Sequence, residues 1–170
     1  TMSTNTVSPK QVRNTSTSLS GARRTSFSAL GASLMFQATS ISSAAMADYR
    51  SLNDQSISLE GPGWQHLVFV NIWDSYAGGG PEGLVAKLPT EFSDKVKRIW
   101  VSPDLNVTPA YLKDYQAAFP QSKPLIIDQH FQLLRSYKLW KTPAHVLLKD
   151  GDVQFSGSGE ELQQYINQQF

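Results

Sequence analysis

Cysteine is absent from this sequence of 170 residues. Without a thiol, these residues cannot form a disulfide, a thiolate metal site or a cysteine nucleophile, and they cannot exchange thiols with disulfides. Charge is also sparse, because only 17% of the residues are charged and the net charge is +1. A net charge this close to zero argues against a nucleic-acid partner.

Acidic residues are missing from one part of the chain. Residues 1–47 contain four of the 15 basic residues and no acid, so residues 48–170 hold 11 bases against 14 acids and are mildly acidic. The length and the 40% content of hydrophobic residues fit one small globular domain preceded by unstructured sequence. We therefore expect a single domain over residues 48–170.

The first 47 residues have the features of an export signal. A polar, Ser/Thr-rich stretch comes first and is expected to be disordered. Arg23-Arg24 then precedes a modestly apolar stretch, which ends in the cleavage pattern Ala45-Met46-Ala47. We predict a disordered n-region and an export signal over residues 1–47, and hence a periplasmic protein.

The route of export stays open on these residues. The paired arginines resemble a Tat signal, but the match is loose and a Sec signal fits equally well. A transit peptide leading to an organelle lumen and a plain unstructured tail are the alternatives. Ser, Thr and Gln interrupt every window long enough to cross a bilayer, so no integral membrane span is expected.

Strand and helix patterns alternate after residue 60. The run Leu67–Trp73 is short, rich in β-branched and aromatic residues, and bounded by glycines, which predicts a strand buried on both faces. Pro81 then begins a predicted helix. Further strands are expected at 96–102 and 124–127, helices from Thr108 and at 131–137, a hairpin of 144–148 and 153–155 around Asp150-Gly151, and a helix at 160–166. This order indicates an α/β fold with parallel strands and an antiparallel edge.

Two segments resemble the signatures of a known protein family. Phe69–Gly80 is similar to the family's strand and active-site segment, with Trp73 at its first tryptophan, Tyr76 before the first cysteine position, and Ala77–Gly80 in place of C-x-x-C. Tyr137–Val153 is similar to the second signature, a proline followed by a strand and a Lys-x-Gly turn. Through these two segments the chain resembles the thioredoxin-like superfamily, and the resemblance covers nearly all of residues 58–170. Residues 119–139 are closer to the TlpA-like and peroxiredoxin-like branch, although the peroxidatic motif is absent.

The resemblance implies a fold and a groove. The fold is a thioredoxin-like one, with a central mixed sheet, flanking helices and a C-terminal β-hairpin plus helix over residues 48–170. Thr142-Pro143 is expected to be a cis peptide bond beside a groove in which an extended peptide pairs with the backbone, whereas an ordinary trans proline opening a strand is the alternative. Trp73, Tyr76 and Trp140 are placed around this peptide-binding groove, unless they serve only in packing.

The chemistry of the family is missing from the corresponding positions. Ala77 has no nucleophile, Gly80 has no side chain, and Asn71 stands near the place of a buried acid that assists proton transfer. These three losses favour a natural degenerate member over an engineered trap. The degenerate loop Ala77, Gly78, Gly79 and Gly80 could still bind an anion at the helix start near Pro81, or could be only flexible.

Other catalytic or metal sites have little support. The three histidines, His66, His130 and His145, lack ligand spacing, so neither a metal nor another cofactor is expected. Ser75 with His145 could serve as nucleophile and base, but no orienting acid or nucleophile elbow accompanies them.

A non-catalytic binding function follows from these expectations. We predict a redox-inactive, non-enzymatic protein of the cell envelope that binds a protein or peptide as chaperone, adaptor or assembly factor. An enzyme with a noncysteine mechanism in the same cleft and a structural subunit of an envelope secretion or conjugation complex are the alternatives. The sequence leaves the partner and the oligomeric state open.

Overall fold

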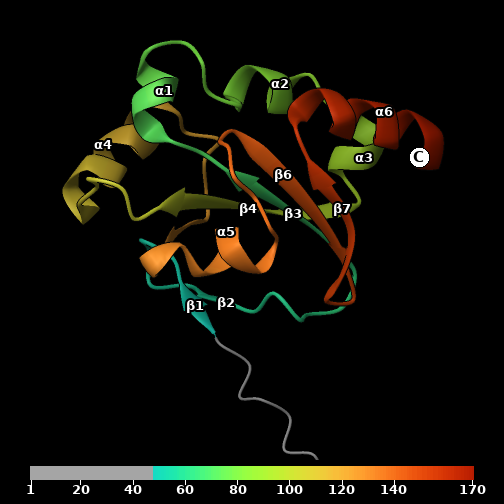
Figure 1. Ribbon diagram of the computed structural model, residues 1–170, viewed down its shortest axis with the longest axis horizontal. Coiled ribbons are helices and arrows are strands. Elements are labelled where there is room, and N and C mark those ends of the chain that lie inside the picture. Colours follow the sequence, from blue (N-terminus) through green and yellow to red (C-terminus); the bar gives the residue numbers. More distant parts are fainter. Residues whose placement is uncertain (1–47) are drawn as a thin grey trace, which may run out of the picture. The chain divides into compact units, whose positions relative to one another are not determined.

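A five-stranded mixed sheet forms the centre of the domain (Figure 1). The computed structural model describes residues 48–170, so the predicted n-region and export signal lie outside the described residues. The strand order is β5-β4-β3-β6-β7, in which β3, β4 and β5 are parallel while β6 and β7 are antiparallel to their neighbours. The strands are β3 (Trp64–Phe69), β4 (Val96–Pro103), β5 (Leu125–Asp128), β6 (Ala144–Lys149) and β7 (Asp152–Gly157).

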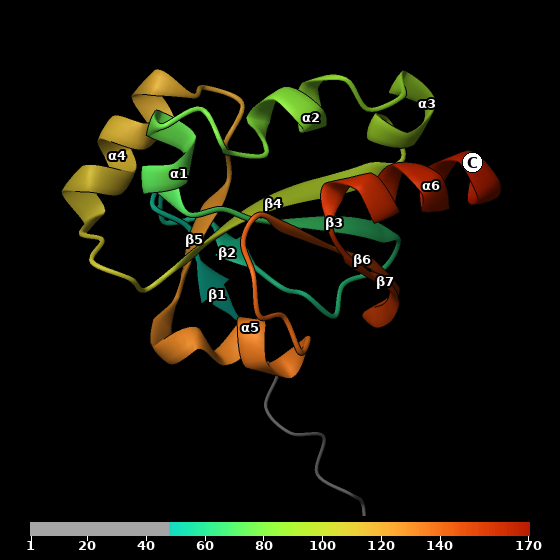
Figure 2. The ribbon, with the colours of Figure 1, turned by 45° about the horizontal axis from the view of Figure 1, so that its top comes forward.

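Helices cover both faces of the sheet (Figure 2). One face carries α1 (Ile72–Tyr76), α2 (Glu82–Ala86), α3 (Thr90–Ser93), α4 (Pro109–Ala118) and α6 (Gly159–Gln169). The other face carries the 3-10 turn η1 (Gln129–Phe131), α5 (Gln132–Ser136), and the short antiparallel pair β1 (Tyr49–Arg50) and β2 (Ser56–Ile57). The sheet therefore has two hydrophobic layers, as its central strands require.

The central strand β3 is buried on both faces, as the sequence predicts. Leu67 and Phe69 pack in the layer beneath α5, whereas Val68 and Val70 pack in the layer beneath α1 and α4. Successive side chains of a strand point to opposite faces, so each contributes to a different layer. Burial of these apolar side chains supplies much of the stability of the domain.

The predicted strand is wrong at its carboxyl end. It was expected to reach Trp73, but β3 stops at Phe69 and α1 begins at Ile72. The side chain of Asn71 caps this helix by accepting a hydrogen bond from the main-chain N–H of Trp73 at 3.1 Å. An Asn cap satisfies a main-chain donor that the first turn leaves free, which outweighs the strand preference of Ile and Trp.

The other predicted elements are present within a few residues of their expected ends. The Thr108 hydroxyl accepts from the main-chain N–H of Tyr111 at 3.3 Å and caps α4. The hairpin β6–β7 turns at Asp150 and Gly151, where φ is +53° and +88°. Asp-Gly is a favoured pair for such a turn because both residues tolerate positive φ.

Two histidines form a buried pair between β3 and β6. His66 Nε2 lies 3.0 Å from His145 Nδ1, and Arg98 Nε donates to His66 Nδ1 at 3.2 Å. Because Nδ1 of His66 accepts from the guanidinium, its ring proton sits on Nε2 and is donated to His145. Burial lowers the pKa of His66 well below its ordinary value and that of His145 to about 4, and Arg98 adds to both effects.

This pair predicts a loss of stability in mild acid. The unfolded chain takes up protons at both histidines near pH 6.5, whereas the folded chain does not, so unfolding binds protons and becomes easier as the pH falls. We expect the free energy of unfolding to be constant above about pH 7 and to decrease between about pH 6.5 and 5, by up to about 1.4 kcal/mol per pH unit for each histidine. Urea unfolding at several pH values measures this.

Two variants show whether the pair causes the slope. His145→Gln keeps a hydrogen-bond acceptor for His66 but removes one titrating ring. The slope of the free energy of unfolding against pH should therefore become shallower. His130→Asn alters an exposed histidine in a left-handed conformation that Asn tolerates, and it should leave the slope unchanged. An equal slope in the wild type and His145→Gln would contradict the explanation.

Candidate functional site

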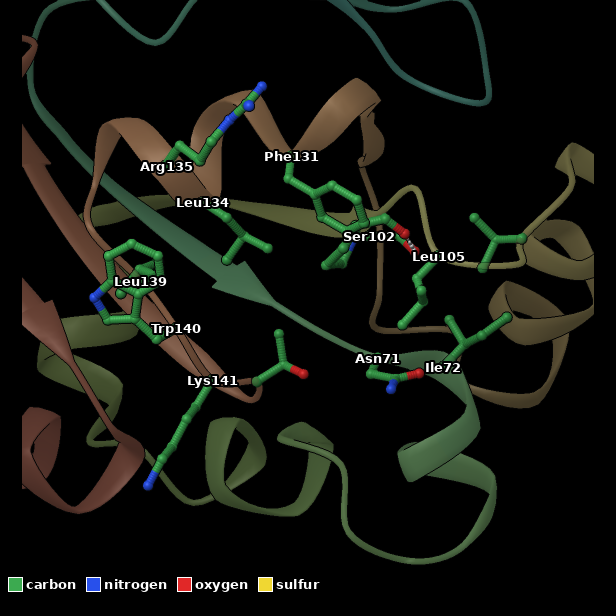
Figure 3. Close-up of a pocket in the computed structure, with 13 residues that line it drawn as sticks. Asn71, Ile72, Ser102, Leu105, Phe131, Leu134, Arg135, Leu139, Trp140 and Lys141 are labelled. Carbon is green, nitrogen blue, oxygen red and sulfur yellow. Dashed lines mark hydrogen bonds between the residues drawn. The ribbon is translucent and has the colours of Figure 1, made fainter.

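A pocket of about 310 Å³ opens at the carboxyl ends of β3 and β4 (Figure 3). In parallel sheets these ends lie at one edge, where side chains from several strands meet, and ligand sites are common there. Most of its wall is apolar. The lining residues are Asn71 and Ile72 after β3, Ser102, Pro103, Leu105 and Val107 from the end of β4 and the chain after it, and Phe131, Leu134, Arg135, Leu139, Trp140, Lys141 and Thr142 between η1 and β6.

Asp128 fixes the helical wall of the pocket. Its side chain is fully buried at the end of β5, and its two carboxylate oxygens accept from the main-chain N–H groups of Leu133 at 2.8 Å and Leu134 at 3.0 Å. These bonds hold the first turn of α5 against the strand. His130 and Phe131 both have positive φ, +53° and +56°, and Phe131 lines the pocket from this turn.

The segment between α5 and β6 supplies main-chain groups beside the pocket. Trp140 is 86% exposed although it is a large aromatic residue. Within residues 48–170, the main-chain N–H and C=O groups of Trp140, Lys141 and Thr142 form no main-chain hydrogen bonds. The following peptide bond, Thr142-Pro143, is cis, as is Lys123-Pro124. An exposed aromatic side chain therefore stands next to three residues with unused pairing capacity.

Two aromatic residues of the predicted groove lie outside the lining of this pocket. Trp73 and Tyr76 belong to α1 and face α4, where Trp73 packs edge-on against Tyr111 with ring centroids 5.4 Å apart and Tyr76 lies 6.0 Å from Phe119. They are 42% and 51% exposed and do not line the pocket. The structure thus brings Trp140 and Thr142 to the pocket, while Trp73 and Tyr76 form part of an aromatic surface on α1 and α4.

The loop at the cysteine positions also lies outside the pocket lining. Ala77 ends α1, and its main-chain N–H bonds back to Trp73 O and Ser75 O. Gly78 has a φ of +84°. A Cβ atom at Gly80 would collide with Ser75 Oγ and Glu82 Oε2 and would lie 2.8 Å from Ser75 Cα. Glycine is therefore required at position 80 by packing.

A buried carboxylate occupies the helix start that follows this loop. Glu82 begins α2, and its Oε1 accepts from Ser75 Oγ at 2.6 Å and from the hydroxyl of Tyr115. Burial, and next the carboxylate, raise the pKa of Tyr115, so its hydroxyl stays a donor. The side chain of Glu82 thus occupies the helix start near Pro81 and ties α1, α2 and α4 together.

The remaining sequence candidates are not assembled into sites. His145 bonds to His66 and Ser75 bonds to Glu82, so each has another partner. Residues 48–170 bring together no three His, Asp or Glu side chains that could hold a metal ion. In the same residues, no helix combines the length and apolar character needed to cross a membrane.

Solved structures share this fold. No protein-family model and no curated protein sequence matches the chain. StoA from Bacillus subtilis aligns with 71% of this chain and 95% of its own length, with a TM-score of 0.54 and 18% identity. The exposed lipoprotein thioredoxin Etrx1 from Streptococcus pneumoniae has a TM-score of 0.55 and 15% identity. The alignment covers 72% of this chain and 98% of that protein.

A third solved structure of similar fold is a single domain of a larger protein. The C-terminal domain of a putative thiol-disulfide oxidoreductase from Bacteroides thetaiotaomicron has a TM-score of 0.57 and 16% identity, over 72% of this chain and 89% of its own. The predicted thioredoxin-like fold is therefore confirmed. Identities this low concern the fold alone, and this chain differs from a thiol-disulfide oxidoreductase in having no cysteine.

Residues that the sequence analysis missed make up much of the pocket. Ile72, Leu105, Phe131 and Leu134 carry no chemical signature, and their apolar character suits a core position equally well. The predicted topology could have located some of them, because residues that directly follow two neighbouring parallel strands must meet at one edge of the sheet.

Restoring both cysteine positions should not restore disulfide reduction. A thiol at Gly80 has no space beside Ser75 and Glu82, and one at Ala77 would end a helix, where the dipole disfavours a thiolate. We expect the double variant Ala77→Cys/Gly80→Cys to be inactive in insulin reduction. Its free energy of unfolding should fall by about 1–3 kcal/mol, as for other overpacked sites.

Alanine substitutions separate the packing effect from the chemistry. Gly80→Ala should lower the free energy of unfolding by a similar amount, because the Cβ atom alone causes the collision. At Gly79 the nearest atom to a new Cβ is Asp74 O at 3.6 Å, an ordinary contact, so Gly79→Ala is the matched control. Equal stability of Gly80→Ala and Gly79→Ala, or insulin reduction by the double cysteine variant, would contradict this reading.

Proposed function

We propose that this protein is a redox-inactive thioredoxin-fold protein of the cell envelope that binds an extended polypeptide in the pocket beside Pro143, as a chaperone, adaptor or assembly factor. One observation carries the proposal: a mostly apolar pocket lies next to three residues whose main-chain groups form no main-chain hydrogen bonds within residues 48–170. A segment of polypeptide uses both features at once, because it offers apolar side chains and a main chain to pair with.

The lining favours binding over catalysis. It contains no His, Asp, Glu or Tyr side chain, and Lys141 is its one side chain of a type that commonly acts as a general acid or base. Its two cations, Arg135 and Lys141, point away from the centre of the pocket (Figure 3). An apolar cavity with few polar groups is well suited to hold a side chain, and it offers little to an enzyme with a noncysteine mechanism.

The segment Trp140–Thr142 favours an extended peptide over a small molecule. Extended peptides gain affinity by pairing their main chain with an unpaired one, and specificity from a pocket for a side chain. A small ligand would leave most of these N–H and C=O groups unused. Trp140, exposed at the rim, supplies the kind of aromatic surface that dominates binding energy at many interfaces.

Loss of Trp140 should weaken peptide binding strongly without unfolding the protein. Peptides selected from a random display library on residues 48–170 would provide ligands, with dissociation constants measured by titration calorimetry. We expect Trp140→Ala to weaken binding about 30-fold, as for an interface hot spot of about 2 kcal/mol. Its free energy of unfolding should change by less than about 0.5 kcal/mol, because the side chain is exposed.

Trp73→Ala is the matched control, since Trp73 is an exposed tryptophan outside the pocket lining. Its dissociation constant should stay within about twofold of the wild-type value if the pocket alone binds the peptide. Equal losses in both variants would extend the site to α1, as the sequence resemblance implies. If no peptide is selected, or if Trp140→Ala binds as well as the wild type, the proposal fails.

Envelope location forms part of the proposal. Its support is the arginine pair and the cleavage pattern in residues 23–47, together with an exposed lipoprotein among the proteins of similar fold. Mass spectrometry of the protein isolated from its own cells tests this directly. We expect a mature chain that begins at Asp48, and an N-terminus at residue 1 or 2 on all molecules would contradict export.

A further inference from the structure

The charged side chains on one wall of the pocket are all positive. From Gln129 to Lys149 the chain contains four cations and no acid. Two of these cations, Arg135 and Lys141, line the pocket, and Lys138 precedes the lining residue Leu139. Arg135 donates to the main-chain oxygen of His130 at 2.7 Å and not to a carboxylate, so its positive charge is not neutralised there.

The opposite wall lacks this positive charge. It is formed by residues after β3 and β4, where the charged residue nearest in sequence to the lining is Asp104, between Pro103 and Leu105. Figure 3 shows the charged ends of Arg135 and Lys141 directed outward, so the positive charge lies at the rim while the centre is apolar. An occupant therefore meets an apolar floor and one basic side.

We infer that the polypeptide bound here carries one large apolar side chain, which enters the pocket, and acidic residues beside it, which lie over the basic wall. The inference rests on the proposed function and adds the chemistry of the partner. A volume of about 310 Å³ is at the lower end for ligand pockets, and suits a single large side chain. Opposite charges at an interface rim favour the matching partner and disfavour partners of like charge.

The chain's own first 47 residues do not fit this description. They contain four basic residues and no acid, so they lack the acidic side chains that would match the basic wall. The same reasoning disfavours basic segments of other proteins. An acidic segment from a separate polypeptide is the occupant that the charges select.

Three synthetic peptides that differ only in charge test the inference. Each has a central Phe with flanking residues that are all Glu, all Lys or all Ser, and each is titrated into the ¹⁵N-labelled protein. The indole N–H of Trp140 reports binding at the pocket. We expect the Glu peptide to bind about tenfold more tightly than the Lys peptide at low ionic strength, with the Ser peptide between them, and the difference to shrink at high salt.

Charge-reversed variants make the test specific to this wall. Lys138→Glu/Lys141→Glu should invert the preference, so that the Lys peptide binds more tightly. Lys97→Glu is the control, because Lys97 is exposed near the start of β4, at the other end of that strand from the pocket. It should keep the preference for the Glu peptide.

The outcomes separate this inference from the proposed function. If all three peptides shift the Trp140 signal with equal affinity, the pocket binds peptides but the acidic preference is wrong. Inversion of the preference by Lys97→Glu as well would show an effect of net charge and would also overturn it. If no peptide shifts the Trp140 signal at any salt concentration, the proposed function itself fails.

Discussion

The cap at Asn71 decides where the candidate functional residues lie. By accepting the Trp73 N–H, its side chain ends the extended chain of β3 and starts α1 five residues before the loop Ala77–Gly80. As a result Ile72 enters the pocket, whereas Trp73 and Tyr76 turn toward α4. One hydrogen bond of an amide side chain thereby separates the pocket from the positions that resemble a redox motif.

Packing determines the residue at one of those positions. Gly80 has no room for a side chain because Ser75 and Glu82 occupy the space, and Tyr115 completes their buried hydrogen-bonded group. A buried carboxyl group is costly unless it is hydrogen-bonded, and here Oε1 of Glu82 accepts from two hydroxyl groups. The group links three helices, so the loop is part of the framework that holds one layer of the domain together.

The fold could be predicted from the sequence further than the site could. The Thr108 cap, the Asp150-Gly151 turn and the alternating apolar runs are local signals, and each is present where expected. The end of β3 was missed because Ile72 and Trp73 favour strands, while the competing cap depends on one side chain. Phe131 was missed because its left-handed conformation depends on Asp128 and the turn that it anchors.

In the proposed function, Trp140, Lys141 and Thr142 pair through their main chain with a bound polypeptide, which needs no cysteine. Amide hydrogen exchange of these three residues, with and without a saturating selected peptide, measures that pairing directly. The account predicts slower exchange at one or more of these amides in the complex and unchanged exchange at Gly78–Gly80. Unchanged exchange at all three residues, with protection appearing instead in the Gly78–Gly80 loop or on α4, would contradict it.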